Sequence, residues 1–348
     1  MPSATVRGPT VISPVTSDDD MESTSVVDPR DEIAADEDLL EDLPGDVDSI
    51  ELIQMRIKSI PALKLDRFEK LDSLCLRENL VEDIEGLESV GPGLVELDLY
   101  DNRINKIESL GPEEGEHMWA KLENLDFSFN KIRKIRHISH LKALKNLYFV
   151  QNKISVIENL VDLDRLDNLE LGGNRIRKLE NLEGVPNLTQ LWVGKNKITK
   201  LENLSRLQNL RILSIQSNRV TKIEGLEALG ALEELYISHN GLTKLEGLDK
   251  NVNLHVLDIS SNEIEHIENL SQLINLQELW ASSNKFSSFD EIERELKHIT
   301  TLNTVYFEGN PIEKENRLTY RNRVRLALGT GIIQIDASMV TESQTSIR

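Results

Sequence analysis

The chain has 348 residues, and its 60 acidic against 40 basic side chains give a net charge of −20. With 39% hydrophobic residues the composition is typical of a globular protein, and the negative charge disfavours nucleic acid as a partner. The single cysteine, Cys75, excludes an internal disulfide and a cysteine-based zinc site. No apolar run is long enough to span a membrane, and the N-terminus lacks a signal-peptide pattern. These features predict a protein of the cytoplasm or nucleus.

Much of the negative charge lies at the N-terminus. Residues 1–48 hold 14 acidic and 2 basic side chains and few aromatic ones. Such a segment cannot bury enough apolar surface to offset the entropy lost on ordering. We therefore expect a disordered acidic tail over residues 1–44, a repeat domain over residues 45–310 and a C-terminal cap over residues 311–348.

The rest of the chain is an internal repeat marked by asparagines. From Asn130 to Asn284 the interval is always 22 residues, and the frame reads L-x-x-L-x-L-x-x-N-x-I-x-x-I-x-x-L. Less regular units surround Asn79, Asn102 and Asn310. A degenerate unit at residues 46–63 has Met55 in the asparagine position, which makes about twelve units. This frame is that of the leucine-rich repeat.

The frame predicts an α/β leucine-rich-repeat solenoid. The L-x-L step has the period of a strand, so stacked units form a curved parallel sheet on the concave face. The asparagine side chain can pair with backbone groups of adjacent turns and so form a buried ladder. A unit of 22 residues leaves little room for a full helix, so the convex face should be 3₁₀ or irregular.

Two longer intervals and the C-terminus interrupt the repeat. Six extra residues fall within residues 111–121, where Trp119 is expected to be a core residue. Four more fall near residues 291–298, where apolar residues have helical spacing. Residues 313–328, followed by Gly329, have the composition of a helix that caps the solenoid.

No pattern in the chain indicates catalysis. There is no phosphate-binding loop, no glycine-rich dinucleotide turn and no nucleophile elbow. His137 and His140 are three residues apart but lack a third ligand at regular spacing. We expect a protein that is not an enzyme and that has no metal or cofactor.

The informative positions are the outward residues of the strands, four before each asparagine. Five of the chain's 15 aromatic residues fall on these 11 positions and alternate with acidic residues. The core leucines do not need them, so the row has the composition of a protein-binding surface for a basic and apolar partner patch. The alternative is that the side chains only stack on one another along the sheet. In chain order the row reads Cys75, Asp98, Asp126, Tyr148, Glu170, Trp192, Ser214, Tyr236, Asp258, Trp280 and Tyr306.

Several stretches resemble a known family of nuclear leucine-rich-repeat regulatory subunits of protein phosphatase 1. They include residues 96–102, 194–201, 216–219 and 238–241, and the resemblance covers roughly residues 46–338. It implies that the concave acidic and aromatic residues contact the phosphatase. With Tyr236 from the same row, the expected partner-binding residues are Asp126, Tyr148, Glu170, Trp192, Tyr236, Asp258, Glu278, Trp280 and Tyr306.

The resemblance also implies a function. It points to a non-catalytic subunit of nucleus and cytoplasm that binds the phosphatase catalytic subunit, with a second small inhibitor in a ternary complex and roles in phosphatase maturation and the cell cycle. The chain has no match to the short motif basic-(Val/Ile)-x-(Phe/Trp) by which most regulators dock, so binding would use the folded surface. The alternative is a structural adaptor of the spliceosomal or cytoskeletal type.

Overall fold

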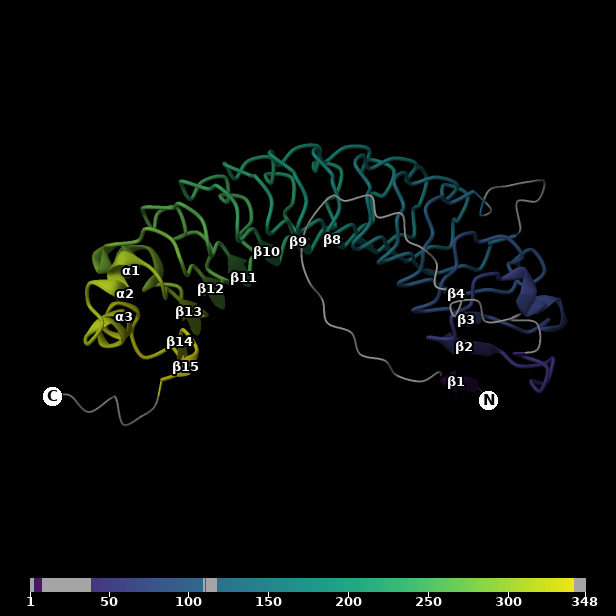
Figure 1. Cartoon of the computed structure of the whole chain (residues 1–348). Helices are drawn as coiled ribbons and strands as arrows, with labels where there is room; N and C mark the ends of the chain where they lie inside the picture. Colours follow the sequence, from purple (N-terminus) through teal and green to yellow (C-terminus); the bar gives the residue numbers. More distant parts are fainter. Residues whose placement is uncertain (1–2, 8–38, 109, 111–117, 341–348) are drawn as a thin grey trace, which may run out of the picture.

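The computed structural model describes residues 3–7, 39–108, 110 and 118–340. They form an arch whose inner face is lined by one sheet, with the strands in chain order from one end to the other (Figure 1). Neighbouring strands are parallel from β1 to β14, and only the last pair, β14 and β15, is antiparallel. The predicted solenoid with its concave parallel sheet is confirmed.

Each expected repeat contributes one strand, including the degenerate first unit, which forms β2 (Ser49–Ile53). The next eleven strands have three residues each and lie at the L-x-L step. They are β3 (Ser73–Cys75), β4 (Glu96–Asp98), β5 (Asn124–Asp126), β6 (Asn146–Tyr148), β7 (Asn168–Glu170), β8 (Gln190–Trp192), β9 (Ile212–Ser214), β10 (Glu234–Tyr236), β11 (Val256–Asp258), β12 (Glu278–Trp280) and β13 (Thr304–Tyr306). The sheet is completed by β1 (Ser3–Arg7), β14 (Gln334–Ile335) and β15 (Ser338–Met339).

The convex side is made of turns and short helices, as the 22-residue length predicts. The first unit has two 3₁₀ helices, η3 (Pro61–Leu63) and η4 (Leu65–Arg67). The unit with four extra residues before β13 contains the eight-residue helix α1 (Phe289–Leu296), which buries Ile292 against the core. Trp119 is only 2% exposed, so its expected core position is confirmed, whereas residues 111–117 of the insertion lie outside the described residues.

The asparagine ladder holds neighbouring turns together. Asn174 donates through Nδ2 to the carbonyls of Phe149 (2.8 Å) and Leu171 (3.0 Å), and its Oδ1 accepts the N–H of Ile154 (2.9 Å). The same pattern repeats from Asn79 to Asn284. Each amide therefore satisfies buried backbone groups of its own turn and of the preceding one.

A second set of asparagines, seven residues after the ladder asparagine in four of the units, was not expected. Asn159, Asn181, Asn203 and Asn269 adopt positive φ and donate to a carbonyl of the preceding unit at 2.6–2.8 Å. Asparagine is one of the few residues that tolerate this backbone conformation. The equivalent residue of another unit is Gly247. A Cβ at this position would lie 2.3 Å from the Ile223 carbonyl oxygen, so that unit requires a glycine here.

The packed region begins before residue 45, earlier than the sequence pattern predicts. Leu40 is 3% exposed within the core, and the guanidinium of Arg67 donates to the carbonyls of Leu40 and Leu43. The backbone of β1 also pairs with β2. The physical reason is that a few apolar residues in the acidic segment can cover the open end of the core. The expected tail at residues 1–2 and 8–38 lies outside the described residues.

The C-terminal cap contains two helices where the sequence predicts one. They are α2 (Pro311–Lys314) and α3 (Tyr320–Leu328), and α3 ends at Gly329 as expected. The break occurs where the Asn316 side chain donates to the Ile312 carbonyl (3.0 Å), a local bond that competes with helix continuation. Beyond α3, the Asp336 carboxylate accepts the N–H groups of Phe307 (2.8 Å) and Glu308 (3.0 Å) and so closes the end of the ladder.

Candidate functional site

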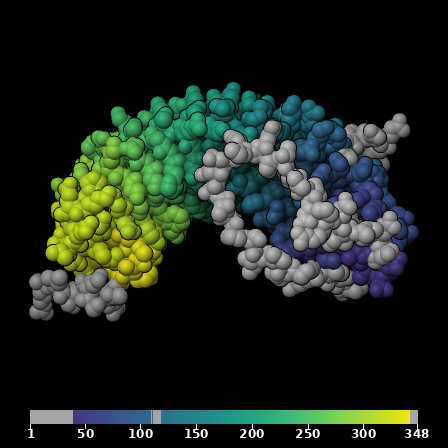
Figure 2. All heavy atoms as spheres, in the orientation of Figure 1, coloured from purple at the N-terminus to yellow at the C-terminus, as the bar shows by residue number. Residues whose placement is uncertain are grey.

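The nine predicted partner-binding residues all lie on strands of the concave sheet. Eight are the last residue of their strand, and Glu278 is the first residue of β12. Strand pairing is in register, so Asp126 lies beside Tyr148 and Trp280 beside Tyr306. The middle residue of each of these strands is a buried leucine or valine, so its two neighbours point to the opposite face of the sheet, on the hollow side of the arch. Figure 2 shows this hollow in a space-filling view.

Four aromatic residues form a continuous chain over β8 to β13. The ring centroids of Trp192 and Tyr236 are 6.2 Å apart with nearly parallel planes. Tyr236 and Trp280 are 6.0 Å apart, and Trp280 and Tyr306 are 6.1 Å apart in an edge-on arrangement. These are favourable aromatic geometries. The side-chain stacking that the sequence left as an alternative therefore occurs here, and it builds one connected apolar strip.

Rings two strands apart can touch because the strands between them, β9 and β11, carry a small or a buried side chain at the outward position. Ser214 is 2% exposed and Asp258 is 8% exposed, although both occupy outward positions. The Oδ1 of Asp258 accepts the N–H of Ser260 at 3.0 Å, which satisfies the buried carboxylate locally. Asp258 is therefore buried beneath the aromatic strip. The alternation of acidic and aromatic residues in the sequence suggests instead that its carboxylate projects into the hollow.

Carboxylates flank the strip on the same strands. Glu278 accepts the indole N–H of Trp280 at 3.0 Å, and Glu234 accepts the hydroxyl of Tyr236 at 2.7 Å. Burial and this hydrogen bond raise the pKa of Tyr236. The sequence reasoning missed Glu234, although it occupies the same strand position as Glu278. The indole nitrogen of Trp192 is buried without a hydrogen-bond partner, so stacking on Tyr236 is the interaction that orients this side chain.

An open pocket of about 280 Å³ lies at the C-terminal end of the strip. It is lined by Trp280, Tyr306, Ser260 and Ser282. The serines stand two residues after the row positions, so small side chains leave space beside the two rings. The pocket can receive one side chain of a partner, with aromatic walls and hydroxyl groups at its rim.

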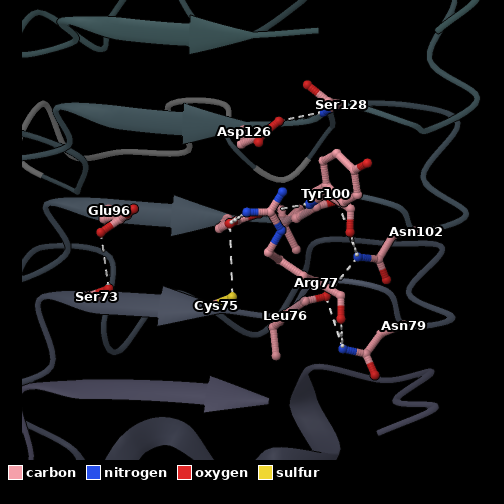
Figure 3. Close-up of polar contacts among 12 residues, drawn as sticks. Ser73, Cys75, Leu76, Arg77, Asn79, Glu96, Tyr100, Asn102, Asp126 and Ser128 are labelled. Atoms are coloured by element: carbon pink, nitrogen blue, oxygen red, sulfur yellow. Dashed lines mark hydrogen bonds and ion pairs between the residues drawn. The ribbon is translucent and has the colours of Figure 1, made fainter. Parts of the chain in front are cut away.

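The N-terminal half of the concave face is polar. Asp98 and Asp126 each accept the N–H group two residues ahead, at 3.0 Å and 2.7 Å. Arg77 pairs with Asp98 at 3.3 Å and lies 4.2 Å from the ring centre of Tyr100 (Figure 3). Burial, with the charge of Asp126 nearby, raises the pKa of Asp98 to about 6.

Two more predicted residues belong to this polar half. Burial, with the charge of Asp126, raises the pKa of Glu170, and burial raises that of Tyr148. Among the described residues, Tyr148 makes no ring contact, so it stands apart from the aromatic strip. Cys75 has a pKa raised to about 11, mainly by burial, so it stays a thiol at neutral pH.

Within the described ranges, no group of three histidine, cysteine, aspartate or glutamate side chains is placed to hold a metal ion. No helix in the same ranges has the length and apolar character needed to cross a membrane.

Known proteins share the repeat architecture of this chain. The fold is that of a leucine-rich-repeat solenoid. A family model described as "Leucine Rich repeats (2 copies)" matches residues 164–206, 186–228 and 230–273. An internalin from Listeria monocytogenes has a similar structure, with a TM-score of 0.64 and 19% identity over 84% of this chain and 88% of its own.

Two curated proteins confirm the resemblance seen in the sequence. The protein phosphatase 1 regulatory subunit SDS22 of Saccharomyces cerevisiae is 48% identical over 110 residues, 31% of this chain and 31% of that protein. SDS22 of Schizosaccharomyces pombe is 54% identical over 103 residues, 28% of this chain and 30% of that protein. The matched stretch thus spans about a third of each relative. Both relatives are regulatory subunits by name.

Proposed function

We propose that this chain is a non-catalytic regulatory subunit of protein phosphatase 1 that binds the catalytic subunit in its concave face. The observation that carries the proposal is the strip of Trp192, Tyr236, Trp280 and Tyr306, which presents connected rings in the hollow of the arch. Half-buried aromatic side chains of this kind are typical anchors of protein interfaces. The similarity to SDS22 supports the identity of the partner.

The two halves of the face would have different tasks in such a complex. The strip and its pocket would bury apolar groups of the phosphatase. Glu234, Glu278 and the carboxylates of the polar half would face basic residues, which favours encounter and correct register. We further propose a second small inhibitor in the same complex, a role in phosphatase maturation and the cell cycle, and a location in both nucleus and cytoplasm.

A binding titration tests the proposal. The purified full chain should bind the purified catalytic subunit of protein phosphatase 1 with one-to-one stoichiometry in isothermal titration calorimetry. A peptide carrying the basic-(Val/Ile)-x-(Phe/Trp) motif should not displace it, because the chain lacks that motif. No heat of binding at micromolar concentrations would reject the proposal and would favour an adaptor for another complex.

A further inference from the structure

A basic surface follows the strands on one flank of the solenoid, outside the concave face. Consider the residues one, three and four positions after each ladder asparagine from Asn102 to Asn240, which we call the basic flank. Of these 21 positions, 14 are lysine or arginine and none is acidic, in a chain with a net charge of −20. The units at either end differ, since Asn79 is followed by Glu82 and Asp83 and Asn262 by Glu263 and Glu265.

The fold places these positions together. The N–H group one residue after each asparagine donates to the carbonyl two residues after the preceding asparagine, as Arg175 does to Ile154 and Lys197 to Ile176, both at 2.8 Å. The aliphatic residue between the flank positions, which is isoleucine, valine or leucine, is fully buried in all seven units, so its neighbours point outward. The cations of successive units therefore stand side by side, and they are densest at Arg133, Lys134, Arg177 and Lys178.

Few cations of the basic flank form ion pairs with acidic side chains of the described residues. In six of the seven units a glutamate lies six residues after the asparagine, and in the unit of Asn130 this place is taken by Arg136. Among the described residues, however, only Lys106, Lys200 and Lys222 form ion pairs with this row of glutamates, at 3.4–3.8 Å. The other eleven cations of the flank have no ion-pair partner within the same described ranges.

One end of the flank is hollowed. A pocket of about 430 Å³ is lined by the cations Lys106, Arg133, Lys134 and Arg136, with Glu108 as its acidic member. Two arginines in one pocket can each make paired hydrogen bonds with a carboxylate. The flank thus offers both a line of charge and a specific place for an acidic side chain.

We propose that the basic flank binds an extended acidic segment of a partner protein. Seven units at ~4.8 Å per strand give a surface about 30 Å long, which matches roughly nine residues of extended chain. Nucleic acid fits less well for two reasons. None of the 21 positions is aromatic, so bases have nothing to stack on, and the adjacent glutamate row would repel a wide phosphate backbone. The inference is independent of the proposed function, because the flank does not include the concave residues.

Fluorescence anisotropy with a labelled 20-residue poly-glutamate peptide tests this inference on the full chain. The wild type should bind at ~0.05 M salt and release the peptide as salt is raised. The double variants R133E/K134E and R177E/K178E should each weaken binding by about tenfold or more. The matched control, R165E/R206E, makes the same change of charge at exposed arginines of the convex turns and should have little effect.

Several outcomes would overturn the inference. Absence of peptide binding at low salt would do so, and so would equal losses in flank and control variants, since then only net charge would matter. Tighter binding of a 20-nucleotide single-stranded DNA in competition would assign the surface to nucleic acid instead. If a reversal variant does not melt like the wild type, R177Q/K178Q replaces it, and unchanged affinity in that variant would also reject the site.

Discussion

The two halves of the concave face share one backbone and differ in the outward side chains of their strands. From β8 to β13, Ser214 and Asp258 are buried between larger residues, so rings two strands apart come into contact. From β3 to β7 most strands carry a polar side chain at the outward position, so carboxylates lie near one another, and burial together with the charge of Asp126 raises the pKa of Asp98. The same repeat frame can therefore carry an apolar strip or a charged surface. Which of the two forms depends on whether every second strand has a small or buried side chain at its outward position.

The largest expected effect tests the aromatic half. Trp280 contacts rings on both sides, so Trp280→Ala should weaken phosphatase binding by ~2 kcal/mol or more, which is about thirtyfold. Trp192 has one ring neighbour, and Trp192→Ala should cost somewhat less. Both variants should melt almost like the wild type, because the core leucines are untouched. Calorimetric titration and thermal melting measure the two quantities.

A variant in the polar half provides the control for this comparison. Tyr148 lies outside the strip, so Tyr148→Ala should reduce affinity less than either tryptophan change. If Tyr148→Ala costs as much as Trp280→Ala, the strip is not the centre of the interface. If neither tryptophan variant loses affinity while both remain folded, the concave strip is not the docking surface.

The second prediction concerns the end of the solenoid next to the polar half. Leu40 covers the core there and is 3% exposed, so Leu40→Ala should destabilise the chain by about 2 kcal/mol. A chain that begins at residue 46 should lose at least as much, because it also lacks the carbonyls that bind Arg67. A chain that begins at residue 39 keeps both interactions and is the matched control. Equal melting temperatures for the chains starting at residues 39 and 46 would contradict this role.

The sequence predicted the fold well because a strict 22-residue spacing leaves few arrangements for its leucines and asparagines. It also predicted which residues point into the hollow, because strand alternation determines direction. The sequence could not predict the orientation of each side chain or how much of it is buried. The contact of Tyr236 with Trp280 across a strand and the burial of Asp258 depend on neighbouring side-chain volumes. The positive φ of Asn159 and the packing of Leu40 were missed because neither belongs to the leucine frame.

The third prediction uses charge to separate the halves. The sequence suggested that Glu170 and Asp258 both face a basic patch, but only Glu170 is accessible enough to do so. Glu170→Lys should slow association by roughly tenfold at low salt, because a repulsion replaces an attraction. Asp258→Asn keeps the oxygen that accepts the Ser260 N–H and should change the association rate very little. Glu224→Lys on the outer side controls for net charge.

Stopped-flow association across a salt series measures this difference. The wild type should slow between ~0.05 and ~0.5 M salt, because exposed charges are screened at distances beyond ~10 Å. The Glu170→Lys variant should lose most of that dependence. Similar slowing by Glu170→Lys and Glu224→Lys would mean that the concave carboxylates do not steer the partner. A large effect of Asp258→Asn would mean that this buried carboxylate reaches the partner after all.

The smallest expected effect is a pH dependence confined to the polar half. Asp98 has a pKa raised to about 6, against ~3.9 for an aspartate in an unfolded chain. Between these two values the folded state holds the proton more tightly, so the stability contributed by protonated Asp98 is lost as pH rises from ~4 to ~6. Asp98→Asn cannot ionise and keeps an oxygen for the Tyr100 N–H, so its melting temperature should rise relative to the wild type over that interval.

Thermal unfolding at pH 4 to 7 measures the difference, with the exposed Asp249→Asn as control. The same pH dependence in both variants would show that Asp98 is as well solvated as a surface carboxylate, and the polar half would then differ from the aromatic half in composition alone.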